Sequence, residues 1–194
     1  MIYRMFGVVL FCLCSGITYA NAKVSYATHY NYFKIQGHSA REIYLSLLHR
    51  AKALSGKDEY ANIDITFSQK PDFVAHGSCA VKKYELHADF QIHLPRLVSP
   101  NIKIPATQAA WRTFVAKLKA HEEHHQALWL ACARALDEQL SSLKANDCPS
   151  LGREFQNLWH EMQTSCQAAN DHFDANERIQ FLKQPLIKSV FSRR

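Results

Sequence analysis

The chain has 194 residues, of which 47% are hydrophobic and 21% are charged, and its formal net charge is +6. This length suits one domain with a sizeable core, and no internal repeat or low-complexity linker divides the sequence. The positive charge is modest. Because no cluster of Lys and Arg forms the basic stripe typical of nucleic-acid binding, we expect no nucleic-acid partner.

The first 22 residues have the three parts of a secretory signal peptide. Arg4 supplies the positive charge, residues 5–17 form a short apolar run, and Ala20-Asn21-Ala22 fits a cleavage site. We therefore expect residues 1–22 to be removed and a single domain to occupy residues 23–194, with no transmembrane segment after cleavage. The protein would be exported, either periplasmic or secreted. The alternative is an uncleaved N-terminal membrane anchor.

The first part of the mature chain predicts a sheet and one short helix. Residues 24–35 are rich in Tyr and β-branched residues and predict a strand. A capping box at Ser39-Ala40-Arg41-Glu42 opens a helix to about residue 53. Residues 61–67 predict a second strand. The clearest strand is 84–94, where apolar and polar residues alternate until Pro95; one face would be buried and the other solvated, as in an antiparallel sheet.

The second part of the chain predicts two long helices. Apolar residues recur at steps of three and four over about residues 107–143, and again after Asp147-Cys148-Pro149. A short connection between two long helices predicts an antiparallel helical hairpin. The fold class is therefore α+β, with a small antiparallel sheet and a short N-terminal helix packed against a long C-terminal helical hairpin.

The first long helix contains His121-Glu122-Glu123-His124-His125, which includes the H-E-x-x-H pattern of zinc metallopeptidases. Two His residues four apart lie on one face of a helix, so both imidazoles can bind one metal ion. His121, Glu122 and His125 fall inside the apolar stripe, where polar groups need partners. They predict a Zn²⁺ site with Glu122 as the general base. The competing interpretation is a chance match on a surface helix.

The helical hairpin restricts the third ligand. Catalytic zinc usually has three protein ligands, and positions level with His121 and His125 on the returning helix fall near residues 167–171. The nearby candidates are Asp171, His172, Asp174 and Glu177, of which we favour His172 or Asp174. The metzincin arrangement is not expected, because Leu128 and Ala131 stand where its motif requires Gly and His.

Four cysteines lie outside the signal segment: Cys79, Cys132, Cys148 and Cys166. An even number in an exported protein predicts two disulfides, with three possible pairings. A Cys148–Cys166 bond is excluded if a continuous helix joins the two, because it would separate them by roughly 27 Å. Of the two remaining pairings we favour Cys132–Cys166 with Cys79–Cys148.

The chain resembles the DUF922 family, described as predicted secreted zinc-dependent proteases. The similarity lies in Tyr32–Gly37 followed by Ser39–Ile43, in Cys79 and Leu94–Leu97, in Trp111, Phe114, Leu118 and His121–His125, and in Cys148–Leu151. The family usually continues with a Tyr-Asp…Thr-x-His-Gly segment. Phe173-Asp174 resembles its start, but Glu177 stands at the Thr position and Ile179 at the His position.

These observations lead to one main functional hypothesis and one alternative. The main hypothesis is an exported zinc metallopeptidase that hydrolyses a peptide or protein substrate with metal-activated water. The alternative is a non-catalytic metal-binding or interaction module of the cell envelope on a metallopeptidase-like scaffold. Ile179 at the expected His position is the main support for that alternative.

Overall fold

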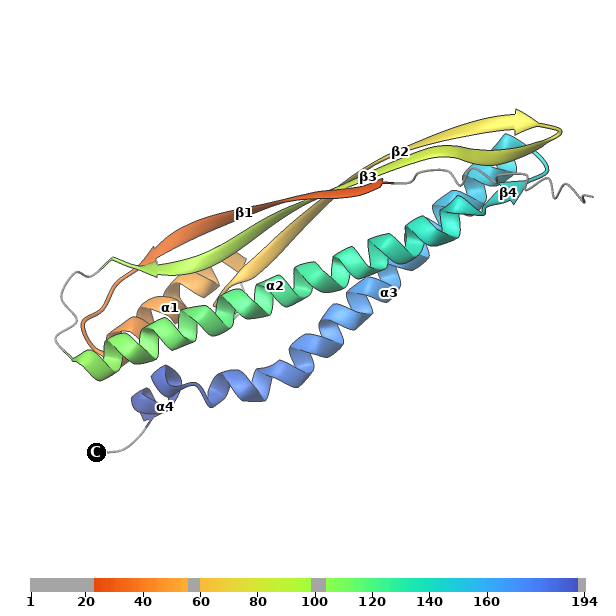
Figure 1. Cartoon of the computed structure of the whole chain (residues 1–194). Coiled ribbons are helices and arrows are strands. Elements are labelled where there is room, and N and C mark those ends of the chain that lie inside the picture. Colours follow the sequence, from red (N-terminus) through yellow and green to blue (C-terminus); the bar gives the residue numbers. More distant parts are fainter. Residues whose placement is uncertain (1–22, 56–59, 99–103, 192–194) are drawn as a thin grey trace, which may run out of the picture.

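A computed structural model describes residues 23–55, 60–98 and 104–191; the predicted signal segment lies outside these ranges. Within these ranges, four helices and four strands confirm the α+β class. In chain order they are β1 (Lys23–Ile35), α1 (Ala40–Ser55), β2 (Asn62–His76), β3 (Ser78–Leu97), α2 (Pro105–Ser141), β4 (Lys144–Ala145), α3 (Cys148–Leu182) and α4 (Pro185–Phe191). The sheet lies over α2, and α3 runs along the other side of α2 (Figure 1).

The sheet is mixed, not wholly antiparallel as expected. β2 and β3 form a long antiparallel hairpin that turns at Gly77, whose φ of 74° suits glycine, whereas β1 pairs with β3 in parallel. The sheet order is β1-β3-β2, so β3 is central, and β4 adds a short antiparallel pair at its N-terminal end. The alternation that predicted the strand reports which face is buried, and it says nothing about the direction of the neighbouring strand.

Strands β2 and β3 extend well beyond the predicted segments 61–67 and 84–94. The prediction that Pro95 ends the strand was wrong, because β3 continues to Leu97. β2 pairs with β3 only as far as His93, so at Pro95 the strand has β1 alone as a neighbour. A proline nitrogen is tolerated where one side of a strand lacks a partner.

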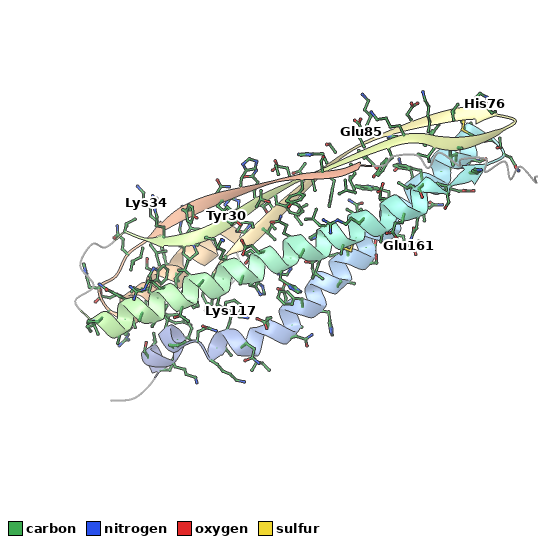
Figure 2. All side chains as sticks on the ribbon, in the orientation of Figure 1. Tyr30, Lys34, His76, Glu85, Lys117 and Glu161 are labelled. Atoms are coloured by element: carbon green, nitrogen blue, oxygen red, sulfur yellow. A yellow bond between two sulfur atoms is a disulfide. The ribbon has the colours of Figure 1, made fainter. Side chains whose placement is uncertain are left out.

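Helix α2 is buried on two sides, because it lies between the sheet and α3. On the sheet side, Gln126 donates to the Thr28 hydroxyl, and Tyr30 donates to Glu123 over 2.6 Å. Figure 2 shows Tyr30 on β1 and, on the other side of α2, Lys117, which pairs with Glu177 of α3. This double contact explains why Leu130 and Ala133 are buried in addition to the predicted apolar stripe.

Two disulfides fix α3 against the rest of the chain, and both predicted pairings are confirmed. Cys79 of β3 is bonded to Cys148 at the start of α3, and Cys132 of α2 is bonded to Cys166 in the middle of α3. Asp147 caps α3 by accepting from the Ser150 N–H over 2.7 Å. One bond therefore ties the closed end of the helical hairpin to the sheet, and the other joins the two helices halfway along α3.

The two larger apolar clusters of the core lie toward the two ends of the molecule, and a smaller third cluster consists of Ala88, Phe90 and Leu130. One apolar cluster includes Phe114 and Leu118 of α2 and packs around α1 and α4. The other includes Leu136 and Leu140 of α2 and packs around β4 and the start of α3. The segment His121–His125 lies between these two clusters, so both ends of its helix are anchored by packing.

Removing the Cys79–Cys148 bond should destabilise the protein by about 2–5 kcal/mol, because the bond closes a loop of 69 residues in the unfolded chain. The measurement is the free energy of unfolding of a Cys79→Ala/Cys148→Ala variant in urea, beside the wild type. Non-reducing peptide mapping of the wild type should recover both disulfides and no free thiol. An unchanged unfolding midpoint, or four alkylatable thiols, would contradict the assignment.

Candidate metal centre

The three predicted residues of α2 lie on the side of the helix that faces the interior. Phe114, Leu118, Glu122 and His125 follow one another at steps of four, four and three, and all are buried. Glu122 is 4% exposed and His125 is 7% exposed. Burial at this level is rare for an acid and an imidazole unless each has a partner. Glu123 instead faces β1, and His124 is exposed.

Helix α3 brings Asp174 to the two histidines. The Oδ1 atom of Asp174 lies 3.0 Å from His121 Nε2 and 2.9 Å from His125 Nε2, and the two Nε2 atoms are 3.1 Å apart. Of the other candidates, Asp171 and His172 are exposed and outside this cluster, and Glu177 pairs with Lys117. Helix α3 is continuous through Asp174.

Asn170 holds the His125 ring, and sequence reasoning missed it. Its Nδ2 donates to the Cys166 carbonyl over 2.8 Å, which turns its Oδ1 toward His125 Nδ1 at 2.6 Å. Asn170 is buried and stands four residues after the buried Cys166, on the same face of α3. The sequence did indicate this residue: its helical spacing from Cys166 places Asn170 inside the apolar stripe of α3, where a polar side chain needs a partner.

The hydrogen bond to Asn170 fixes which ring nitrogen of His125 is free. When the Nδ1–H group donates a hydrogen bond to Asn170, the Nε2 atom of a neutral His125 ring carries a lone pair. That lone pair faces a carboxylate oxygen and a second imidazole nitrogen at 2.9 and 3.1 Å. Three Lewis bases this close are stable only around a proton or a cation. An orienting hydrogen bond on the far nitrogen is the usual arrangement of a metal-ligating histidine.

The cluster has the donors and the spacing that a metal ion requires. His121, His125 and Asp174 each offer one ligand atom, and these three atoms lie within 4.8 Å of one another. Ligands at 2.0–2.1 Å in tetrahedral geometry are roughly 3.3 Å apart, close to the separations seen here. Two imidazoles and one carboxylate match the ligand set of three-ligand catalytic zinc sites. The residues therefore fit Zn²⁺.

Aromatic packing orients His121. The Phe173 ring stacks on it with centroids 4.8 Å apart, and the Phe181 ring meets it edge-on at 5.2 Å. Its Nδ1 is buried and has no hydrogen-bond partner among the described residues. Burial and the neighbouring His125 lower the pKa of His121, against the opposing effect of the Asp174 carboxylate. The ring therefore favours its neutral form, which is the form that binds a metal.

A pocket of about 290 Å³ opens beside the cluster. His121, Glu122 and Asp174 line one part of it, and Arg178 lies on the same wall as Asp174, one turn further along α3. The Asp174 side chain is 54% exposed, against 12% for His121. The cluster is therefore buried on the α2 side and accessible from the pocket. Sequence reasoning did not identify Arg178.

A model of a bacterial protein family of unknown function, DUF922, matches residues 30–180. The matched segment runs from β1 to near the end of α3 and contains all the residues of the cluster. Neither the curated proteins nor the solved structures give a significant match.

Replacing Asn170 should weaken metal binding without removing a ligand. Asn170→Ala leaves the His125 Nδ1–H without its acceptor, and loss of such an orienting partner typically costs about 10–100-fold in metal affinity. The measurement is zinc affinity by chelator competition. Asn170→Asp keeps an acceptor oxygen and should lose less. Gln167→Ala, an exposed change on the same helix, is the control. Equal affinity of Asn170→Ala and the wild type would remove Asn170 from the metal centre.

Proposed function

The chain belongs to the DUF922 family, and from its metal centre we propose that it is an exported zinc-dependent metallopeptidase. One observation carries the proposal: three metal-binding donors from two helices converge next to a buried carboxylate, and the same pocket reaches both. His121, His125 and Asp174 would hold the ion. Glu122 stands beside them on α2, outside the ligand set, as a general base requires.

The chemistry divides between the bound ion and the chain. When bound, Zn²⁺ would polarise the scissile carbonyl and lower the pKa of the attacking water. Glu122 takes one proton from that water as its oxygen bonds to the carbonyl carbon, and then gives the proton to the departing nitrogen as the C–N bond breaks. Asn170 keeps the His125 ring in place, and Phe173 and Phe181 do the same for His121.

The proposed location rests on the disulfides and the first 22 residues. Disulfides form and persist in oxidising compartments, and the described residues of this chain contain two. In the described part of the chain, no helix has the length and apolar character needed to cross a membrane. We propose that the mature protein begins at Lys23 and acts in the periplasm or outside the cell, on a peptide or protein substrate.

The purified mature protein should contain about one zinc ion per chain, because the three donors are already held together in the fold. A His121→Ala/His125→Ala variant should lose the zinc and the stability that binding adds. Elemental analysis and thermal unfolding with and without a chelator make the measurement. His172→Ala, which changes an exposed histidine on α3, is the matched control. Equal zinc in the double variant and the wild type would place the metal elsewhere.

The Glu122→Gln protein should keep its zinc and lose its peptidase activity. The substitution preserves size but removes the carboxylate that accepts the proton, and loss of a general base typically costs about 10²–10⁴-fold in rate. Both proteins are assayed on a mixed peptide library at neutral pH, with metal content measured in parallel. Glu123→Gln, whose carboxylate faces β1, is the control. A zinc-loaded wild type that cleaves nothing would favour the non-catalytic envelope module, and equal cleavage by both would assign the base elsewhere.

A further inference from the structure

The pocket beside the metal centre contains a cation that the proposed chemistry does not use. Arg178 lies on α3 four residues after Asp174, so both side chains leave the same face of the helix. The pocket wall thus joins a candidate metal ligand, the candidate base Glu122 and a guanidinium group. A planar guanidinium binds carboxylates through two parallel hydrogen bonds, which makes it selective for that group.

The two acids next to Arg178 on α3, Asp174 and Glu177, do not pair with it. Asp174 is engaged with the two histidines, and Glu177 lies 2.5 Å from the ammonium group of Lys117. Within the described ranges, Arg178 forms no ion pair, and its side chain is exposed. The positive charge therefore remains available to a ligand that enters the pocket.

The rest of the pocket is largely apolar and small. Its other lining residues are Tyr60, Ala61, Leu118, Phe181 and Leu182. A volume of about 290 Å³ is at the lower end of the usual range for ligand sites, so it holds one or two residues of a peptide. A single amino acid that offers both a bulky apolar side chain and a carboxylate is the C-terminal residue of a peptide.

We infer that Arg178 binds the free C-terminal carboxylate of a peptide substrate whose last residue is bulky and apolar. Arg178 would be a specificity residue, and the enzyme would cleave close to the C-terminus. The specificity role rests on the proposed peptidase function. Binding of a carboxylate by Arg178 can be tested separately from that function. Hydrolysis uses only water as co-reactant: the C–N bond breaks, a C–O bond forms, and the proton passes through Glu122 to the leaving amine.

The binding test compares N-acetyl-L-phenylalanine with N-acetyl-L-phenylalaninamide, which differ only in the carboxylate. Titration calorimetry on the metal-free and the zinc-loaded mature protein gives the affinity for each. The wild type should prefer the acid. Arg178→Gln should weaken binding of the acid about 5- to 50-fold and leave binding of the amide unchanged, because it removes a charge-assisted pair. Arg178→Lys should restore part of the affinity as a point charge.

The control is Arg153→Gln, which removes the same charge from an exposed position of α3 about 37 Å away along the helix. It should change neither affinity. Equal weakening of acid and amide by Arg178→Gln would give Arg178 a general role in the pocket and overturn the inference. Unchanged binding of both would show a merely solvated cation and would also overturn it.

The kinetic test uses pairs of peptides that end in phenylalanine or in its amide. For the wild type, kcat/KM should be higher for the free acid, and Arg178→Gln should abolish that preference mainly through KM. An undiminished preference in an active Arg178→Gln protein would overturn the inference and leave the peptidase proposal intact. If the zinc-loaded wild type hydrolyses neither peptide, the peptidase proposal fails, and the binding test still decides the role of Arg178.

Discussion

The geometry of the candidate metal centre depends on two linked hydrogen bonds at the contact between the two long helices. The Asn170 amide nitrogen donates a hydrogen bond to the Cys166 carbonyl, and the amide oxygen accepts a hydrogen bond from the Nδ1–H group of His125. This relay crosses from α3 to α2 inside the protein, where an unpaired donor or acceptor would be costly. It also sets the direction of the His125 Nε2 lone pair. The same hydrogen bonds thus link the register of α3 against α2 to the geometry of the candidate metal centre.

The Cys132–Cys166 bond lies at the same level as this relay. Cys166 contributes its sulfur to the disulfide and its carbonyl to Asn170, so one residue helps to fix both the separation of the helices and the orientation of the candidate ligand His125. The next turn of α3 carries Phe173 and Asp174, which contact His121. Covalent, polar and aromatic contacts therefore follow one another along one face of α3.

The centre is rigid on one side and accessible on the other. Glu122 and His125 are packed between two apolar clusters, whereas Asp174 and Arg178 border a pocket. A hydrolytic site needs this combination. The base and the metal ligands must keep their geometry, and the substrate must still reach them. A purely structural metal site would more often have all its ligands enclosed.

The sequence alone determined the features that depend on spacing within one helix or on residue type. The four-residue step placed His121 and His125 on one face of α2, the apolar period placed Glu122 with them inside the fold, and the straight path of a helix excluded a Cys148–Cys166 bond. These follow from fixed helical geometry.

Only the tertiary structure places Asp174, and not His172, beside His121 and His125. Which residue of α3 lies opposite a given residue of α2 depends on how the two helices pack, and this is not a local property of the sequence. The same crossing sets what the side chains of Asn170 and Arg178 face. The parallel pairing of β1 with β3 was decided in the same way. Alternation shows which side of a strand is buried, whereas the neighbouring strand and its direction are set by the path of the whole chain.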